Sequence, residues 1–139
     1  MGIDAEKAKA LLERNEYTCV LCRGEAVSYS CHRGVRPLVD FLDSGVDYAG
    51  FSAADKVVGK ATAFLYVLLG VREVYAGVLS DAAAAVFERY GISFSCGQRV
   101  PAIRNRDNTG FCPMEQATRD IQDPAQALAA VRNTLKKLQ

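Results

Sequence analysis

The chain has one histidine and no tryptophan among its 139 residues. One histidine excludes a histidine-rich metal site within a single chain. The sequence also lacks an H-x-E or P-C-x-x-C motif from which a zinc site could be built. We therefore expect no metal site and no cofactor.

The chain also has no large excess of positive or negative charge and no long apolar run. Lys and Arg number 17 against 16 Asp and Glu, and no basic cluster is present, so we expect neither nucleic acid nor an anionic membrane as a partner. Residues 1–7 have no apolar signal core, and the longest apolar run, residues 61–71, is too short to span a bilayer. These absences predict a cytoplasmic protein.

The five cysteines are therefore expected to remain thiols. Cys19 and Cys22 have the spacing of a metal or redox pair, but they fall in a segment that reads as a strand. Residues three apart on a strand point to opposite faces. We interpret the two cysteines as buried or half-buried thiols.

Hydrophobic periodicity and capping residues predict a single α/β domain over residues 1–139. We expect helices over residues 4–15, 36–42 and 50–70, one from Ser80 to Gly91, and a C-terminal extension over 120–139 with Pro124 at its first turn. We expect strands over residues 17–22, 26–30, 73–78 and 92–95, the first two as a hairpin and the last two as parallel neighbours. The resulting sheet is mixed, with helices on both faces.

Asp55 and Lys56 are the most informative residues, because they fall near the start of a central helix that is apolar on every face. Ionisable groups in such a helix are either paired or line a pocket. Asp55 can also complete a capping box with Ser52. Lys56 and Lys60 lie one turn apart and either reach toward an anion or are solvated.

A second polar segment follows the last predicted strand. Arg104, Asn105 and Arg106 lie in a loop suited to holding a phosphate or carboxylate, or in a solvated turn. Cys112, followed by Pro113, is placed as the cap of a short helix, where a thiol can become a reactive thiolate. It is otherwise an unreactive, partly buried cap.

Three stretches carry a family resemblance: RGVRPL at residues 33–38, GFSAADKVVGKA at 50–61, and VPAIRNR at 100–106 followed by GFCPME at 110–115. They resemble the domain-of-unknown-function 1893 family of small bacterial and archaeal proteins, over about residues 4–118. That family is related by fold to the cytidine deaminases. The resemblance implies a three-layer α/β/α sandwich with a mixed sheet of about five strands.

The resemblance does not imply deamination. A zinc deaminase carries a His ligand and, two residues on, a Glu at the head of its central helix, and two Cys ligands at the head of the next helix. This chain offers Ala53 and Asp55 at the first position and residues 80–83, Ser-Asp-Ala-Ala, at the second. The metal ligands are therefore missing. We expect a pocket to remain where the starts of these two helices meet the sheet.

Two functions from different classes follow, and neither is excluded by the sequence. The first is zinc-free binding of a nucleotide-like or other anionic small molecule. Lys56 with Arg104 or Arg106 would hold the anionic group, and Asp55 and Asn105 would read polar edges. Ser52 and Lys60 are further candidate ligand contacts.

The second is an enzyme, a non-zinc transferase or hydrolase, with Cys112 as nucleophile. Asp55 or His32 would be its base and Lys56 an electrostatic stabiliser. His32 is otherwise an ordinary surface or interface histidine. A structural role through homodimerisation is the third alternative.

Overall fold

The computed structural model describes residues 1–104 and 112–138, and a five-stranded mixed sheet forms its centre. In spatial order the strands are β2 (Ala26–Ser30), β1 (Cys19–Arg23), β3 (Ser52–Val58), β4 (Glu73–Ser80) and β5 (Ser93–Val100). β1 is antiparallel to both β2 and β3, whereas β3, β4 and β5 are parallel. The predicted hairpin and parallel pair are confirmed.

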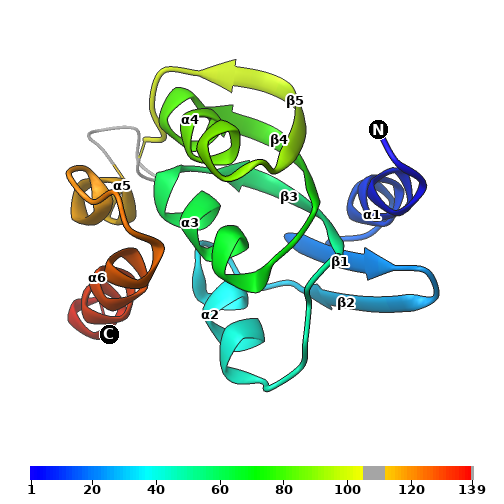
Figure 1. Ribbon diagram of the computed structural model, residues 1–139, viewed down its shortest axis with the longest axis horizontal. Helices are drawn as coiled ribbons and strands as arrows, with labels where there is room; N and C mark the ends of the chain where they lie inside the picture. The colour runs from blue at the N-terminus through cyan, green and yellow to red at the C-terminus, as the bar shows by residue number, and fades with distance from the viewer. Residues whose placement is uncertain (105–111, 139) are drawn as a thin grey trace.

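Helices cover both faces of this sheet (Figure 1). α1 (Ile3–Arg14) packs on one face through Ala8 and Leu12. The other face carries α2 (Arg36–Asp43), α3 (Lys60–Leu69) and α4 (Asp81–Tyr90), with α5 (Pro113–Thr118) and α6 (Pro124–Lys137) packed against α3. The fold is a three-layer α/β/α sandwich, as predicted.

The two faces bury different sides of β1. Cys19 and Leu21 belong to the large core beneath α3, whereas Val20 and Cys22 pack beneath α1. Both cysteines are free thiols on opposite faces, which confirms the interpretation of their spacing.

Residues 50–70 do not form one helix, and this part of the prediction is wrong. The segment is β3, then Gly59, then α3. β3 is the middle strand and its first four residues are all buried, so its side chains do not alternate between buried and exposed. Such a run is indistinguishable by periodicity from a buried helix.

The change of element overturns the proposed capping box. Ser52 begins β3 and pairs with Cys22 and Glu73, while Asp55 lies mid-strand opposite Cys19. Neither residue caps a helix.

Other predicted helix ends are confirmed. The Ser80 hydroxyl accepts a hydrogen bond from the Ala83 peptide N–H, and α4 ends at Gly91 in the left-handed region. Asp123 caps α6 in the same way, through the Gln126 N–H. Cys112 is the residue before α5, with Pro113 in its first turn.

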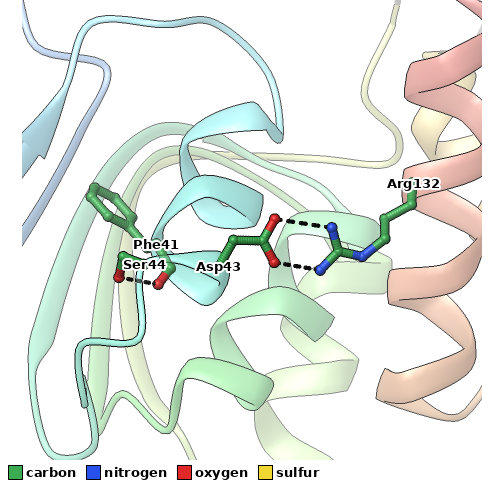
Figure 2. Close-up of polar contacts among 4 residues, drawn as sticks. All are labelled: Phe41, Asp43, Ser44 and Arg132. Atoms are coloured by element: carbon green, nitrogen blue, oxygen red, sulfur yellow. Dashed lines mark hydrogen bonds and ion pairs between the residues drawn. The ribbon is translucent and has the colours of Figure 1, made fainter.

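α6 is fastened to the large core. Ala127 and Val131 are fully buried, and the Arg132 guanidinium makes two hydrogen bonds, of 2.7 and 3.0 Å, to the carboxylate of Asp43 at the end of α2 (Figure 2). The guanidinium lowers the pKa of Asp43 below its ordinary value. In the described part of the chain, no helix has the length and apolar character needed to cross a membrane.

Candidate functional site

A cavity of about 370 Å³ opens where β3 ends and α3 begins. Its lining comes from four regions of the chain: Thr18 and Cys19; Arg33, Gly34 and Val35; Asp55, Lys56, Val57, Gly59, Ala61 and Thr62; and Ile103, Cys112, Met114 and Glu115. The structure thus brings Asp55, Lys56 and Cys112, the three predicted catalytic candidates, to one cavity.

An irregularity in two neighbouring strands shapes the cavity wall. The core beneath α3 takes Ala53 from β3 and then Val58, and takes Ala76 from β4 and then Leu79, so the alternation of buried residues shifts by one at the same level in both strands. The register is the same on both sides of the shift, Asp55 with Ala76 and Val57 with Val78, so neither strand has an extra residue. Two successive residues, Lys56 and Val57, consequently reach the cavity.

Gly77 lies beside this shift and tolerates no side chain. A Cβ there would come within 2.7 Å of the Lys56 carbonyl oxygen, which is backbone and has little freedom to move. The close approach of the two strands therefore depends on glycine at this position.

Asp55 is the buried acid of the cavity, with a relative exposure of 7%. Its Oδ2 accepts a hydrogen bond of 2.7 Å from the Tyr66 hydroxyl, and the nearby peptide N–H groups of Val57 and Lys56 also favour the charged form of the carboxyl. Burial raises the pKa of Asp55 to about 7, although these hydrogen bonds oppose the rise. Among the described residues no cation forms a salt bridge with it.

A second carboxylate, that of Glu115, occupies the head of α3. Its Oε1 accepts a 2.8 Å hydrogen bond from the Lys60 peptide N–H. Gly59 makes room for it, since a Cβ at Gly59 would collide with that carboxylate. Burial raises the pKa of Glu115, whereas the Lys60 N–H and charge act in the opposite direction.

Cys112 is half-buried and free. Its peptide N–H donates to the Ile103 carbonyl at 3.2 Å, and its carbonyl accepts from the Gln116 N–H. These backbone contacts fix Cys112 at the cavity rim before α5.

Two of the predicted ligand contacts, Ser52 and Lys60, do not line this cavity. Ser52 lies at the opposite end of β3. The Lys60 ammonium donates to the Arg119 carbonyl at 2.8 Å and lies over the Phe64 ring. Neither residue is part of the lining.

The remaining candidates lie elsewhere. Arg104 is exposed and is not part of the lining, and Asn105 and Arg106 lie outside the described residues. His32 is exposed, and its carbonyl accepts from the Thr18 hydroxyl at 2.6 Å.

Sequence reasoning missed Arg33, Glu115 and Tyr66 as site residues. Arg33 and Glu115 both fall within the stretches that carry the family resemblance, which was the available signal. Tyr66 gave none, because its place beside Asp55 depends on how α3 packs over β3.

The comparison with zinc deaminases also needs correction. Ala53 and Asp55 are strand residues, and the head of the central helix is formed by Gly59, Lys60 and Ala61. In residues 1–104 and 112–138, no group of three or more His, Cys, Asp or Glu side chains is arranged to hold a metal ion.

Comparisons with known proteins place the chain in a family. The family model described as "Domain of unknown function (DUF1893)" matches residues 7–135. The chain belongs to the DUF1893 family. A search of curated proteins found no match.

Two solved structures are similar to this DUF1893 protein. A DUF1893 family protein from Thermotoga maritima superimposes with a TM-score of 0.87 at 24% identity, covering 96% of this chain and 91% of that one. The dCMP deaminase of cyanophage S-TIM5, in apo form, has a TM-score of 0.45 at 11% identity, covering 70% of this chain and 94% of that one. The first similarity supports the fold described above.

Proposed function

We propose that this DUF1893 protein binds, without zinc, a small organic anion that carries a nucleobase-like hydrogen-bonding edge. The observation that carries the proposal is Asp55, a buried carboxyl at a cavity wall that no cation of residues 1–104 or 112–138 pairs with in a salt bridge. A carboxyl that titrates near neutrality offers both a donor and an acceptor to a ligand. Amide and amidine edges of heterocycles present the complementary pair.

The cavity walls suit a flat ring. Val35, Val57, Ile103 and Met114 supply apolar surface, and about 370 Å³ lies within the range of small-molecule sites. A ring placed between these side chains would direct its polar edge toward Asp55.

Lys56 and Arg33 supply the positive charge for an anionic substituent. Both line the cavity and are exposed, so an anion there would stay partly hydrated. Glu115 disfavours an anion at the head of α3, because its carboxylate already accepts from the Lys60 N–H. The anionic group is therefore assigned to the Lys56 and Arg33 side of the cavity.

Isothermal titration tests the proposal with free bases, nucleosides and nucleoside 5′-monophosphates of cytosine, adenine and guanine. We expect at least one monophosphate to bind more tightly than its nucleoside. Asp55→Ala, which removes the hydrogen-bonding group altogether, should weaken binding about tenfold. Arg33→Ala should abolish the preference for the phosphate.

Matched controls are the exposed residues Asp40 and Arg14, each changed to Ala, which should leave binding unchanged. The proposal is wrong if no compound of the panel binds, or if Asp55→Ala binds as tightly as the wild type. Stoichiometric zinc in the purified protein, measured by plasma mass spectrometry, would contradict its zinc-free part.

A thiol-dependent enzyme is the second candidate, favoured by Cys112 and Asp55 lining the same cavity. The rate of Cys112 alkylation by iodoacetamide against pH separates the two. The measurement is made in a background with Cys31→Ser and Cys96→Ser, because Cys31 is exposed and Cys96 is half-buried like Cys112. A midpoint near the ordinary thiol value of about 8.5 supports binding, and a strongly lowered one supports covalent chemistry.

A further inference from the structure

Three buried side chains lead from the cavity wall into the core beneath α3. The Tyr66 hydroxyl donates to Asp55 Oδ2 at 2.7 Å and lies 3.1 Å from Cys19 Sγ. Cys19 and Asp55 are direct partners across β1 and β3, and Tyr66 comes from α3. The exposures are 1% for Cys19, 0% for Tyr66 and 7% for Asp55. The function proposed above uses only Asp55.

The number of protons fixes the direction of these hydrogen bonds. Tyr66 has one O–H hydrogen, which goes to Asp55. The Tyr66 oxygen is then left to accept from the Cys19 S–H group. Burial raises the pKa of the Cys19 thiol and of the Tyr66 phenol well above their ordinary values, so both groups stay protonated. Two donors in series therefore end at one oxygen of Asp55.

We infer that Tyr66 and Cys19 are positioning residues that keep Asp55 Oδ2 as an acceptor, so that the proton of the neutral carboxyl lies on Oδ1. The relevance of this arrangement to a ligand rests on the proposed function. Neutral Asp55 then donates from Oδ1, and ionised Asp55 only accepts. The chain of donors consequently sets both the orientation of the acid and the pH at which it changes from donor to acceptor.

Other ionisable groups around Asp55 come from three segments. Lys56 follows it on β3, Arg33 lies on the segment before α2, and Cys112 and Glu115 line the same cavity at the start of α5. The neighbouring strand β4 contributes Ala76, which carries no charge. The hydrogen bonds from Tyr66 and Cys19 are thus separable from these charges by substitutions that alter no formal charge.

The test measures the pH midpoint at which Asp55 titrates. NMR monitors this titration in the whole 139-residue chain, labelled with ¹³C at the aspartate carboxyls. Tyr66→Phe keeps the ring and removes the donor to the carboxylate, so the midpoint should rise by about one pH unit. Cys19→Ala should raise it by a smaller amount, because the Tyr66 oxygen loses its donor. Cys19→Ser keeps a donor and should restore the wild-type midpoint.

Tyr48→Phe is the matched control, because Tyr48 is also buried in the large core but its hydroxyl pairs with Ser28. It should leave the midpoint unchanged. An unchanged midpoint in Tyr66→Phe overturns the inference. If Tyr66→Phe does not fold, identical midpoints in Cys19→Ala and wild type overturn it instead. No ligand is needed, so the result is independent of whether the proposed function holds.

Discussion

The two faces of the sheet are built on different principles. Beneath α1, Ala8 and Leu12 meet Val20, Cys22 and Ala54 in a small apolar cluster. Beneath α3 the core is much larger, and the two charged side chains that are buried in the described part of the chain, Asp55 and Lys60, lie on this side. Burying a charge is unfavourable unless it is compensated, so the α3 face gives up stability at the place where the cavity lies. We expect substitutions beneath α1 to change stability alone and substitutions at the cavity to change recognition.

The largest expected effect is the pH dependence contributed by Asp55. Its folded pKa of about 7 lies above the ordinary value of 3.8, so its stabilising contribution is complete below about pH 4 and is lost as pH rises through 7. The difference corresponds to about 4 kcal/mol in the free energy of unfolding, at one pKa unit per 1.4 kcal/mol. Urea denaturation at several pH values should therefore show Asp55→Asn gaining stability relative to wild type between pH 4 and 8.

The same experiment carries its own control. Glu115, whose pKa is also raised, contributes in the same direction, so Glu115→Gln should remove a smaller part of the dependence. Parallel pH profiles for wild type and Asp55→Asn would contradict the burial of an unpaired acid at this wall.

On the opposite face, Leu12→Ala should cost about 3 kcal/mol, as large-to-small changes in a core do. Leu12 is 5% exposed beneath α1, and its neighbour Leu11 is half-buried. Leu11→Ala is the matched control and should cost clearly less. Urea denaturation measures the stability of both variants. Both should keep the wild-type titration midpoint of Asp55, and a shifted midpoint would show that the two faces of the sheet are energetically coupled.

How far the sequence determined these two faces depends on the range of the interactions. Ser80, Gly91 and Pro124 act within one helical turn, and the helix ends that they mark were predicted correctly. β3 was missed because a strand buried on both faces has no periodicity of its own, although Gly59 and two successive valines marked its end. Asp55 and Lys56 were predicted as pocket residues, but from a helix that does not exist.

The contacts that define the site are the least predictable part. Glu115 reaches Lys60 across 55 positions of sequence, and Cys19 reaches Tyr66 across 47. Such pairs depend on how helices pack over the sheet, which no local pattern encodes. The sequence marked these contacts only indirectly, for example through Gly59, which leaves space for the Glu115 side chain.

That glycine gives the next prediction. Gly59→Leu should destabilise by about 2 kcal/mol through overpacking against Glu115 and loss of its bond to Lys60. Gly59→Ala should cost less, because the end of the Glu115 side chain can move. In a Glu115→Ala background the cost of Gly59→Ala should shrink. Thermal unfolding of the four proteins of this cycle measures the coupling, and additive shifts would show that Glu115 is not the neighbour that requires glycine.

The smallest expected effect on stability, and the sharpest test of the comparison, is Lys56→Ala. Lys56 is exposed and forms no salt bridge in the described part of the chain, so its removal should change the free energy of unfolding by less than about 0.5 kcal/mol. Binding of a nucleoside monophosphate should nevertheless weaken, because Lys56 lines the cavity together with Arg33. Lys136→Ala, at the end of α6, removes the same charge far along the chain and should change neither quantity. Isothermal titration and urea denaturation of both variants test this prediction. If Lys56→Ala binds the monophosphate as tightly as wild type, Lys56 is not part of the site. A large loss of stability in Lys56→Ala would show that the residues proposed to recognise the ligand also stabilise the cavity wall.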